Sequence, residues 1–533
     1  MSRPPLPSFI ADLTADRRAA GALLASIAAL FAAGMDPKIM APAATSTQAA
    51  IRAQPDIEGL LILVSVVTAL LLLVGGALGD VSRARPIIVG GLTASLVCGI
   101  LATTVYLAVG SGGLAFTLVR FAGIASAAFV MPVALAMAAT AYSGIARATA
   151  IGFAYAGYGL GQGLSPTLVS LIPDSYLPAF IGSIAACALA LIVVRGRIPD
   201  LERATRAERP LVAGNALWAS AVVLVSSGLL WLGAGWTHPL RWALILGGVA
   251  LIVAFFAWER RRRTEHTDAV RVERRPVTIA LFVGLVIAMA QIIPMSQLPL
   301  YFGVGLRYGS IFGMVALAPL FVALVLAGPI AGFLLARFEP RKLIAGGMLA
   351  IGIGDLFLAA IIGPTTHYLV FIVPLVLVGA GFVVATTVRT AIIFASVPRG
   401  LPATAAALNE ASIEVGTRAG IVIVTALLAE VSVAAYASSL AGQPPAEVDA
   451  LIAAFRGVLT ALGTPSFDAV IRAVQPGELA VYGAAYFTGV QVAMLAGGVI
   501  AVAGSAIAWM TLGRRNPLQT VYEHRDERAV AAG

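Results

Sequence analysis

Ionisable side chains inside long apolar stretches are the residues of this sequence most able to do chemistry. Asp36 lies 18 residues beyond Arg18, about 27 Å along a helix that rises 1.5 Å per residue. Arg120 lies in another apolar stretch, about 10 Å along it by the same rise. Because a charge inside a membrane costs about 2.5–3.5 kcal/mol, such residues indicate ion or proton pathways. We expect Asp36 to bind a proton and Arg120 to be its partner; a fixed structural ion pair is the alternative.

A second group of ionisable residues lies in the apolar stretch 402–436. Glu410, Glu414 and Arg418 follow one another at intervals of four residues, so a helix places them on one face. A face with three charges is not expected to point toward lipid. We expect Glu410 and Glu414 to bind protons or a cationic substrate, and a structural network with Arg389 is the alternative.

Further polar side chains in apolar stretches are candidates for contact with a substrate. Asp355 is a lone acid in a glycine-rich segment, where a coupling role and a helix-packing role are equally open. Amide side chains join membrane helices as readily as they hold a ligand. The candidate cavity residues are Gln162, Gln291, Asp355, Asn409 and Arg418.

A short motif occurs twice, about half a chain apart. The copies run over 76–87 and 332–343, and each joins a helix end rich in small residues to a charged turn. Glycines permit close helix approach, and an acid at a helix boundary can pair with arginines or with the N-terminus of a neighbouring helix. The motif therefore predicts a latch that holds one conformation. Its residues are Gly76, Asp80, Arg85 and Arg341.

The composition predicts an integral membrane protein. Of 533 residues, 59% are hydrophobic and 11% are charged, whereas soluble domains have about 25% charged residues. The net charge of +9 comes from arginines in short connections, so topology explains it better than nucleic-acid binding. Cys98 and Cys187 both lie in apolar stretches, and no metal or catalytic spacing is present. We expect no enzyme activity, no metal and no cofactor beyond a proton gradient.

Hydropathy predicts an all-α protein with fourteen membrane-spanning helices. Arginines concentrate in alternate connections, which predicts cytoplasmic termini in an inner (cytoplasmic) membrane. The spans are 18–40, 57–79, 85–109, 113–141, 147–171, 176–194, 212–234, 239–258, 277–301, 309–336, 341–363, 368–395, 402–436 and 480–513.

The spans divide as six plus two plus six. We expect an N-terminal six-helix bundle in 1–200, an inserted helix pair with basic flanks in 201–275, a C-terminal bundle in 276–513 and a cytoplasmic tail in 514–533. The inserted pair has five of the six tryptophans, which typically lie at the headgroup level. This pair contains no acidic residue in its spans, which predicts a lipid-facing position.

The connection 437–479 is long and is expected on the extracytoplasmic side. Apolar residues recur in it at helical spacing, which predicts an amphipathic helix. We expect a hairpin lying on the membrane surface; docking of an extracytoplasmic partner and gating of the substrate are the alternatives. The apolar residues are Val448, Leu451, Ile452, Phe455, Leu459 and Leu462.

The repeated motif resembles the signature G-x-L-x-D-x-x-G-R-[RK] of the major facilitator superfamily, and the span count resembles its fourteen-span drug:proton antiporters. Gly76, Leu78, Asp80 and Arg85 match, while Arg83 and Ala84 depart from the pattern. The segments around Asp36 and Arg120 and the glycine-rich run 157–166 are similar to further motifs of these antiporters. The final glycine pair of the last motif is absent.

The resemblance implies two six-helix bundles around a central cavity, with alternating access. We expect a proton-coupled exporter of an amphipathic or cationic small molecule, similar to a multidrug efflux transporter, with the proton, the substrate and membrane lipids as its partners. A transporter of an envelope lipid or lipid-like metabolite is the nearest alternative. A membrane receptor or scaffold without transport is the alternative from another class.

Overall fold

The computed structural model describes residues 16–512, with gaps at 53–54, 110–113, 170, 172–176, most of 200–238, 266–273, 307, 309–312, 314, 398–399, 462–470, 473 and 475. Within these residues every regular element is a helix. Long apolar runs favour this outcome, because a helix satisfies all its backbone hydrogen bonds internally where water is absent. Multiple apolar helices make this a multi-pass membrane protein.

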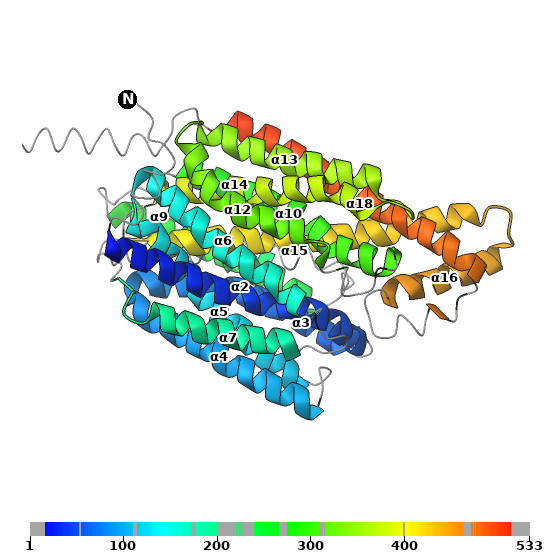
Figure 1. The fold of residues 1–533 in the computed structure, drawn as a ribbon, viewed down its shortest axis with the longest axis horizontal. Helices are drawn as coiled ribbons and strands as arrows, with labels where there is room; N and C mark the ends of the chain where they lie inside the picture. Colours follow the sequence, from blue (N-terminus) through cyan, green and yellow to red (C-terminus); the bar gives the residue numbers. More distant parts are fainter. Residues whose placement is uncertain are drawn as a thin grey trace, which may run out of the picture.

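The helices form two halves (Figure 1). In the N-terminal half, α2 packs against α5, α6 and α7, and α4 packs against α5 and α7. Its helices are α2 (Arg17–Arg52), α3 (Pro55–Val81), α4 (Ala84–Val109), α5 (Leu114–Ala141), α6 (Gly144–Val169) and α7 (Leu177–Val194).

In the C-terminal half, α10 packs against α14, α15 and α18, and α13 packs against α14 and α18. Its helices are α10 (Arg274–Leu300), α12 (Ala318–Leu335), α13 (Pro340–Ile361), α14 (Ile372–Ser396), α15 (Pro402–Ser439) and α18 (Pro476–Thr511). A π-helix (Tyr301–Gly305) follows α10, and a 3-10 helix (Tyr368–Phe371) precedes α14. The order of helices is the same as that predicted, although α12 begins later than residue 309.

Two helix pairs form the seams between the halves. On one side α6 lies against α12, and on the other α3 lies against α15. The first seam is close at Gly152, where an added Cβ would overlap the backbone of Gly328. The second is close at Gly76, where a Cβ would overlap Ala407 and approach the carbonyl oxygen of Ala403. Glycine therefore sets the distance between the halves on both sides.

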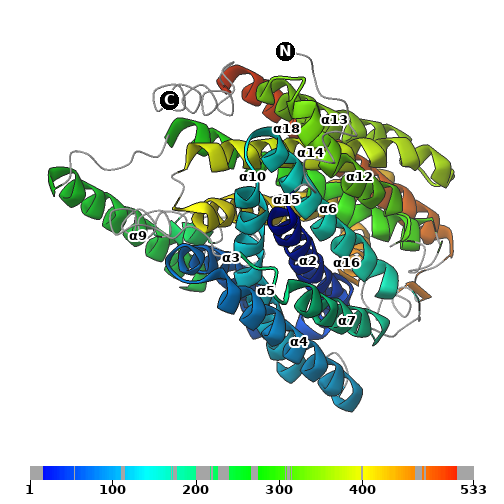
Figure 2. The same cartoon turned by 60° about the vertical axis from the view of Figure 1, so that its left-hand side comes forward.

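Part of the segment 201–275, predicted to be an inserted helix pair, lies beside the α3–α15 seam. Helix α9 (Pro239–Glu265) flanks α3 in Figure 2. Leu244 of α9 and Val223 belong to one apolar cluster with residues of α3 and α15. The described residues include ten helices long and apolar enough to cross a membrane, besides shorter apolar helices at Val67–Val81 and Pro239–Phe255. The total of fourteen spans stays a prediction.

Helices α15 and α18 are longer than a membrane needs. With 38 and 36 residues they extend about 57 and 54 Å, whereas a bilayer with its headgroups is about 40–45 Å thick. Their ends and α16 (Pro445–Ala461) form the projection at the right of Figure 1. We call this the α16 end of the molecule, and the opposite end the Asp80 end.

The apolar face of α16 packs against the ends of α15 and α18. Phe455 of α16 is buried between Tyr436 of α15 and Tyr482 of α18, and each of its ring centroid distances is 4.8 Å. Val448, Leu451, Ile452 and Leu459 pack around this cluster, while Leu462 lies outside the described residues. The residues that predicted an amphipathic helix thus cover other helices of this chain.

Candidate functional site

A buried polar network joins the two halves. The Tyr155 hydroxyl of α6 donates a hydrogen bond to Glu410 Oε1 of α15 at 2.7 Å. Asn409 Nδ2 donates to the same oxygen at 2.9 Å and to the Tyr155 oxygen at 2.6 Å. Thr390 Oγ1 of α14 donates to Asn409 Oδ1 at 3.0 Å. Because a carboxylate buried in an apolar region needs such donors, these contacts hold Glu410 as a buried polar link between the halves.

Small residues surround the side chains of this network on α6 and α15. Asn409 and Glu410 follow a run of alanines in α15, residues 403, 405, 406 and 407, all buried. Tyr155 lies between buried Ala154 and Ala156 in α6. Small side chains allow the helices to approach closely enough for direct polar contact. The network thus lies in a tightly packed region, with all four of its side chains buried.

Arg389 lies on the C-terminal side of this network. Its side chain is fully buried in α14. Arg389 Nη1 donates to Ala280 O of α10 at 3.2 Å and to Ser412 Oγ of α15 at 3.1 Å. A Cβ on Gly284 would overlap the guanidinium, so this glycine provides the space for it. Among the described residues Arg389 forms no ion pair with Glu410.

Glu414 and Arg418 separate from Glu410, although all three share a helix. They form an ion pair with each other, with side chains 29% and 32% exposed. Glu410 instead points into the buried network. The predicted charged face is therefore divided between a half-exposed pair and a buried acid.

Arg120 is buried in the N-terminal half, with its guanidinium 5.5 Å from the ring centroid of Phe180 on α7. This places it next to the aromatic cluster of Tyr106, Phe116 and Phe180. The side chain of Asp36 lies outside the described residues, so the proposed Asp36–Arg120 pair stays a prediction.

The remaining cavity candidates lie apart from one another. Asp355 is fully buried within the C-terminal half, where a Cβ on Gly497 of α18 would be 2.9 Å from its Oδ2. Its carboxylate oxygens have no hydrogen-bond partner in the described part of the chain. Gln291 is buried in α10, and Gln162 lies in α6 at an intermediate degree of burial. Only Asn409 of these candidates joins the network at Glu410.

Asp80 lies at the second contact between the halves. Its Oδ1 accepts a hydrogen bond from Ala403 N at 2.7 Å, and its Oδ2 accepts one from Thr404 N at 2.8 Å. Both donors belong to the first turn of α15, where backbone N–H groups lack helical acceptors and the helix dipole favours a negative charge. Gly79, one residue earlier, leaves space for Ala403. The carboxylate thus ties α3 to α15, whereas Arg85 is exposed.

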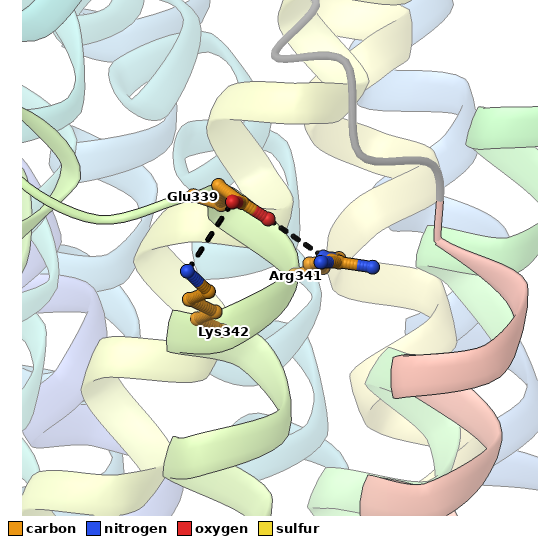
Figure 3. Close-up of polar contacts among 3 residues, drawn as sticks. All are labelled: Glu339, Arg341 and Lys342. Atoms are coloured by element: carbon orange, nitrogen blue, oxygen red, sulfur yellow. Dashed lines mark hydrogen bonds and ion pairs between the residues drawn. The ribbon is translucent and has the colours of Figure 1, made fainter.

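The second motif copy makes contacts within one half (Figure 3). Glu339 Oε2 accepts from Arg341 Nε at 2.7 Å, and its Oε1 lies 3.2 Å from Lys342 Nζ. These two cations hold the pKa of the exposed Glu339 carboxyl below its usual range. Arg341 also lies over the ring of Trp509 on α18, 4.8 Å from its centroid. Because Ala336 occupies the position equivalent to Asp80, no acid of this copy reaches the other half.

Sequence reasoning did not identify Tyr155 or Thr390. Tyr155 lies in the glycine-rich run of α6, where it looks like an ordinary apolar packing residue. Thr390 follows Arg389 in a span that also contains Thr386 and Thr387. That group of polar residues in an apolar span was a signal that could have predicted a buried network on α14.

Two helical halves that meet at a buried protonatable group, with a further tie at one end, form the architecture of a membrane transporter rather than an enzyme. The chain belongs to the Major Facilitator Superfamily, whose model matches residues 24–417.

Curated relatives are similar to part of this chain. It is 31% identical over 245 residues to a triacylglyceride transporter of Mycolicibacterium hassiacum, covering 45% of each protein. It is 29% identical over 240 residues to a triacylglyceride transporter of Mycobacterium tuberculosis, covering 44% of this chain and 46% of the relative. It is 27% identical over 312 residues to a probable actinorhodin transporter of Streptomyces coelicolor, covering 55% and 52%. The chain thus matches about half the length of these relatives.

Solved structures share the fold over nearly the whole chain. The human organic anion transporter MFSD10 superposes with a TM-score of 0.57 at 13% identity, covering 92% of this chain and 99% of that one. The proton:xylose symporter XylE superposes with a TM-score of 0.54 at 12% identity, covering 95% and 99%. At these identities the similarity concerns the fold alone.

Proposed function

We propose that this protein is a proton-coupled secondary transporter that exports a lipid-like or amphipathic molecule across the cytoplasmic membrane. The observation that carries the coupling is the hydrogen bond between Tyr155 and Glu410. A single proton on Glu410 changes a buried polar contact between the halves, and so a pH difference can bias which end of the molecule is open.

The relatives support the cargo class. The triacylglyceride transporters are named for a lipid, and the actinorhodin transporter is named for a different small molecule. This chain matches half of each type, so a lipid or lipid-like molecule is the first candidate and an amphipathic small molecule is the second. The absence of the final antiporter glycine pair favours the lipid over a cationic drug.

We further propose the parts of the mechanism. Asp36 and Glu410 bind and release protons, while Asp80 holds the α3–α15 seam closed at the Asp80 end, which is cytoplasmic. Alternating access then consists of the two halves rocking about the buried network. The fourteen-span topology, with the inserted pair on the lipid-facing side of one seam, belongs to the same proposal.

Flux into vesicles tests the proposal. Purified protein is reconstituted in proteoliposomes, and movement of a fluorescent triacylglycerol analogue is followed with and without an imposed pH gradient. We expect gradient-dependent movement that a protonophore abolishes, and Asp36→Asn should abolish it while expression is preserved. Movement of an amphipathic dye but not of the lipid would favour the second cargo class. A receptor or scaffold would show no gradient-dependent movement of either probe.

A further inference from the structure

We propose that Glu410 has two alternative partners, Tyr155 in the N-terminal half and Arg389 in the C-terminal half, and exchanges one for the other when the halves separate. This proposal rests on the proton-coupled transport proposed above. In the present conformation Glu410 is held by Tyr155 and Asn409. In the separated conformation its carboxylate would bind Arg389.

The state of Arg389 is the first observation. Its side chain is fully buried, and its Nε and Nη2 atoms have no hydrogen-bond partner in the described part of the chain. A buried guanidinium normally forms bidentate contacts with a carboxylate. Two buried nitrogens without acceptors cost free energy. In this conformation Arg389 is therefore a cation that lacks an acceptor for part of its guanidinium.

The position of that acceptor is the second observation. Glu410 is close enough to Arg389 for an electrostatic interaction, but it is not within ion-pair distance. Ser412 connects Arg389 to the backbone of Asn409, the residue before Glu410: its hydroxyl accepts from Arg389 and donates to Asn409 O at 2.6 Å. Arg389 and Glu410 both belong to the C-terminal half, so their separation does not depend on the position of α6.

The exchange compensates the charge of Glu410 when the halves separate. When α6 moves away from α15, an ionised Glu410 loses the Tyr155 hydroxyl and would remain in an apolar region without its charge compensated. The ionisable groups that face it are Tyr155 and Tyr158 of α6, Arg389 of α14 and Glu414 of α15. Arg389 is the cation among them on its own half, and it has donors available. Protonated Glu410 needs no such partner.

The test measures the distance between the halves and requires no substrate. Spin labels are attached to full-length protein in nanodiscs, at S143C in the N-terminal half and E339C in the C-terminal half, with Cys98 and Cys187 replaced by alanine. Both label positions lie at the Asp80 end, where Ser143 is exposed and the Glu339 side chain is 38% exposed. The fraction of molecules with the longer distance is measured by pulsed electron resonance between pH 5 and 9.

Three variants report on the exchange. R389Q should reduce the separated fraction at high pH by about tenfold, because a hydrogen-bonded charge loses its partner. The double variant R389Q/E410Q should restore it, because no charge remains to be compensated. Y155F should increase the separated fraction at high pH, because Glu410 then has only Arg389 as a strong partner. R389K, which retains the charge, should resemble the wild type.

The outcomes separate this proposal from the general one. The exchange is wrong if R389Q leaves the separated fraction unchanged, or if adding E410Q does not restore that fraction. An arginine with a purely structural role would change the separated fraction equally in R389Q and in R389Q/E410Q. The Y155F variant retains Arg389, so its result does not depend on whether R389Q folds. An unchanged or reduced separated fraction in Y155F would also overturn the exchange. If the distances between the labels change as expected but no lipid flux is found, the result would count against the proposed transport function and not against the exchange.

Discussion

A carboxylate in an apolar interior is stable only if donors surround it or a proton neutralises it. Glu410, Asp80 and Asp355 show three different solutions in one chain. Glu410 accepts from two side chains in different halves, and Asp80 accepts from two backbone N–H groups. Asp355 has no hydrogen-bond partner among the described residues. These differences decide which acid can respond to a movement of the halves.

Asp80→Asn tests the tie between the halves. Asparagine retains the shape and one acceptor but loses the negative charge and one hydrogen bond to the first turn of α15. We expect the seam to be weakened by about 0.5–2 kcal/mol, the usual value of a helix cap. Increased alkylation of a cysteine placed at Ala403 would report this opening.

Glu339→Gln is the matched control for Asp80→Asn. Glu339 contacts only residues of its own half, and its exposed ion pairs contribute little to stability. Because cations hold its pKa low, any contribution is present at neutral pH and is lost as the pH falls through that lowered value. Equal opening of the seam in both variants would show that Asp80 has no special role.

Gly497→Ala tests the packing of Asp355. The new methyl group would lie 2.9 Å from Asp355 Oδ2 and 3.0 Å from Ile293 Cδ1. Overpacking of this kind typically costs about 1–3 kcal/mol, so the unfolding temperature in detergent should fall. Adding Asp355→Ala should recover part of the loss. A double variant that is less stable than the sum of the two single variants would contradict this placement.

At the scale of elements, helix positions follow directly from runs of apolar residues. The predicted spans 85–109 and 402–436 correspond to α4 and α15 within a few residues. What pattern alone could not provide is the partner of each polar side chain. Tyr155 and Glu410 are 255 residues apart, and the packing of α6 against α12 and α14 of the other half brings them together. The apolar face of α16 was recognised, but pattern could not distinguish a membrane from α15 and α18 as its partner.

Phe455→Ala tests how α16 is attached. Its ring is buried between Tyr436 and Tyr482, and removing a buried phenylalanine ring costs about 3–5 kcal/mol. We expect α16 to open locally, seen as faster hydrogen exchange in 445–461, while the two bundles retain their protection. Arg456→Ala, at the exposed next position, should leave exchange unchanged. Equal effects from both variants would show that the aromatic cluster does not hold α16.

At the scale of the whole molecule, the halves meet at three kinds of contact. Glycines set the closeness of both seams, Asp80 ties one seam at its end, and the Tyr155–Glu410 bond lies between them. The last two contacts each depend on a buried carboxyl group that a single proton would neutralise, and the Tyr155–Glu410 bond is the one made by side chains of both halves. The two motif copies are therefore not equivalent, because the second contains no acid that reaches the opposite half.

The most direct test of the account is lipid flux by the Glu410→Gln variant in proteoliposomes with an imposed pH gradient. Glutamine can still accept from Tyr155, but it cannot bind and release a proton. We predict that the variant folds and moves the fluorescent triacylglycerol analogue equally slowly with and without the gradient, while the gradient accelerates the wild type. Gradient-driven flux in the variant equal to that of the wild type would contradict the account.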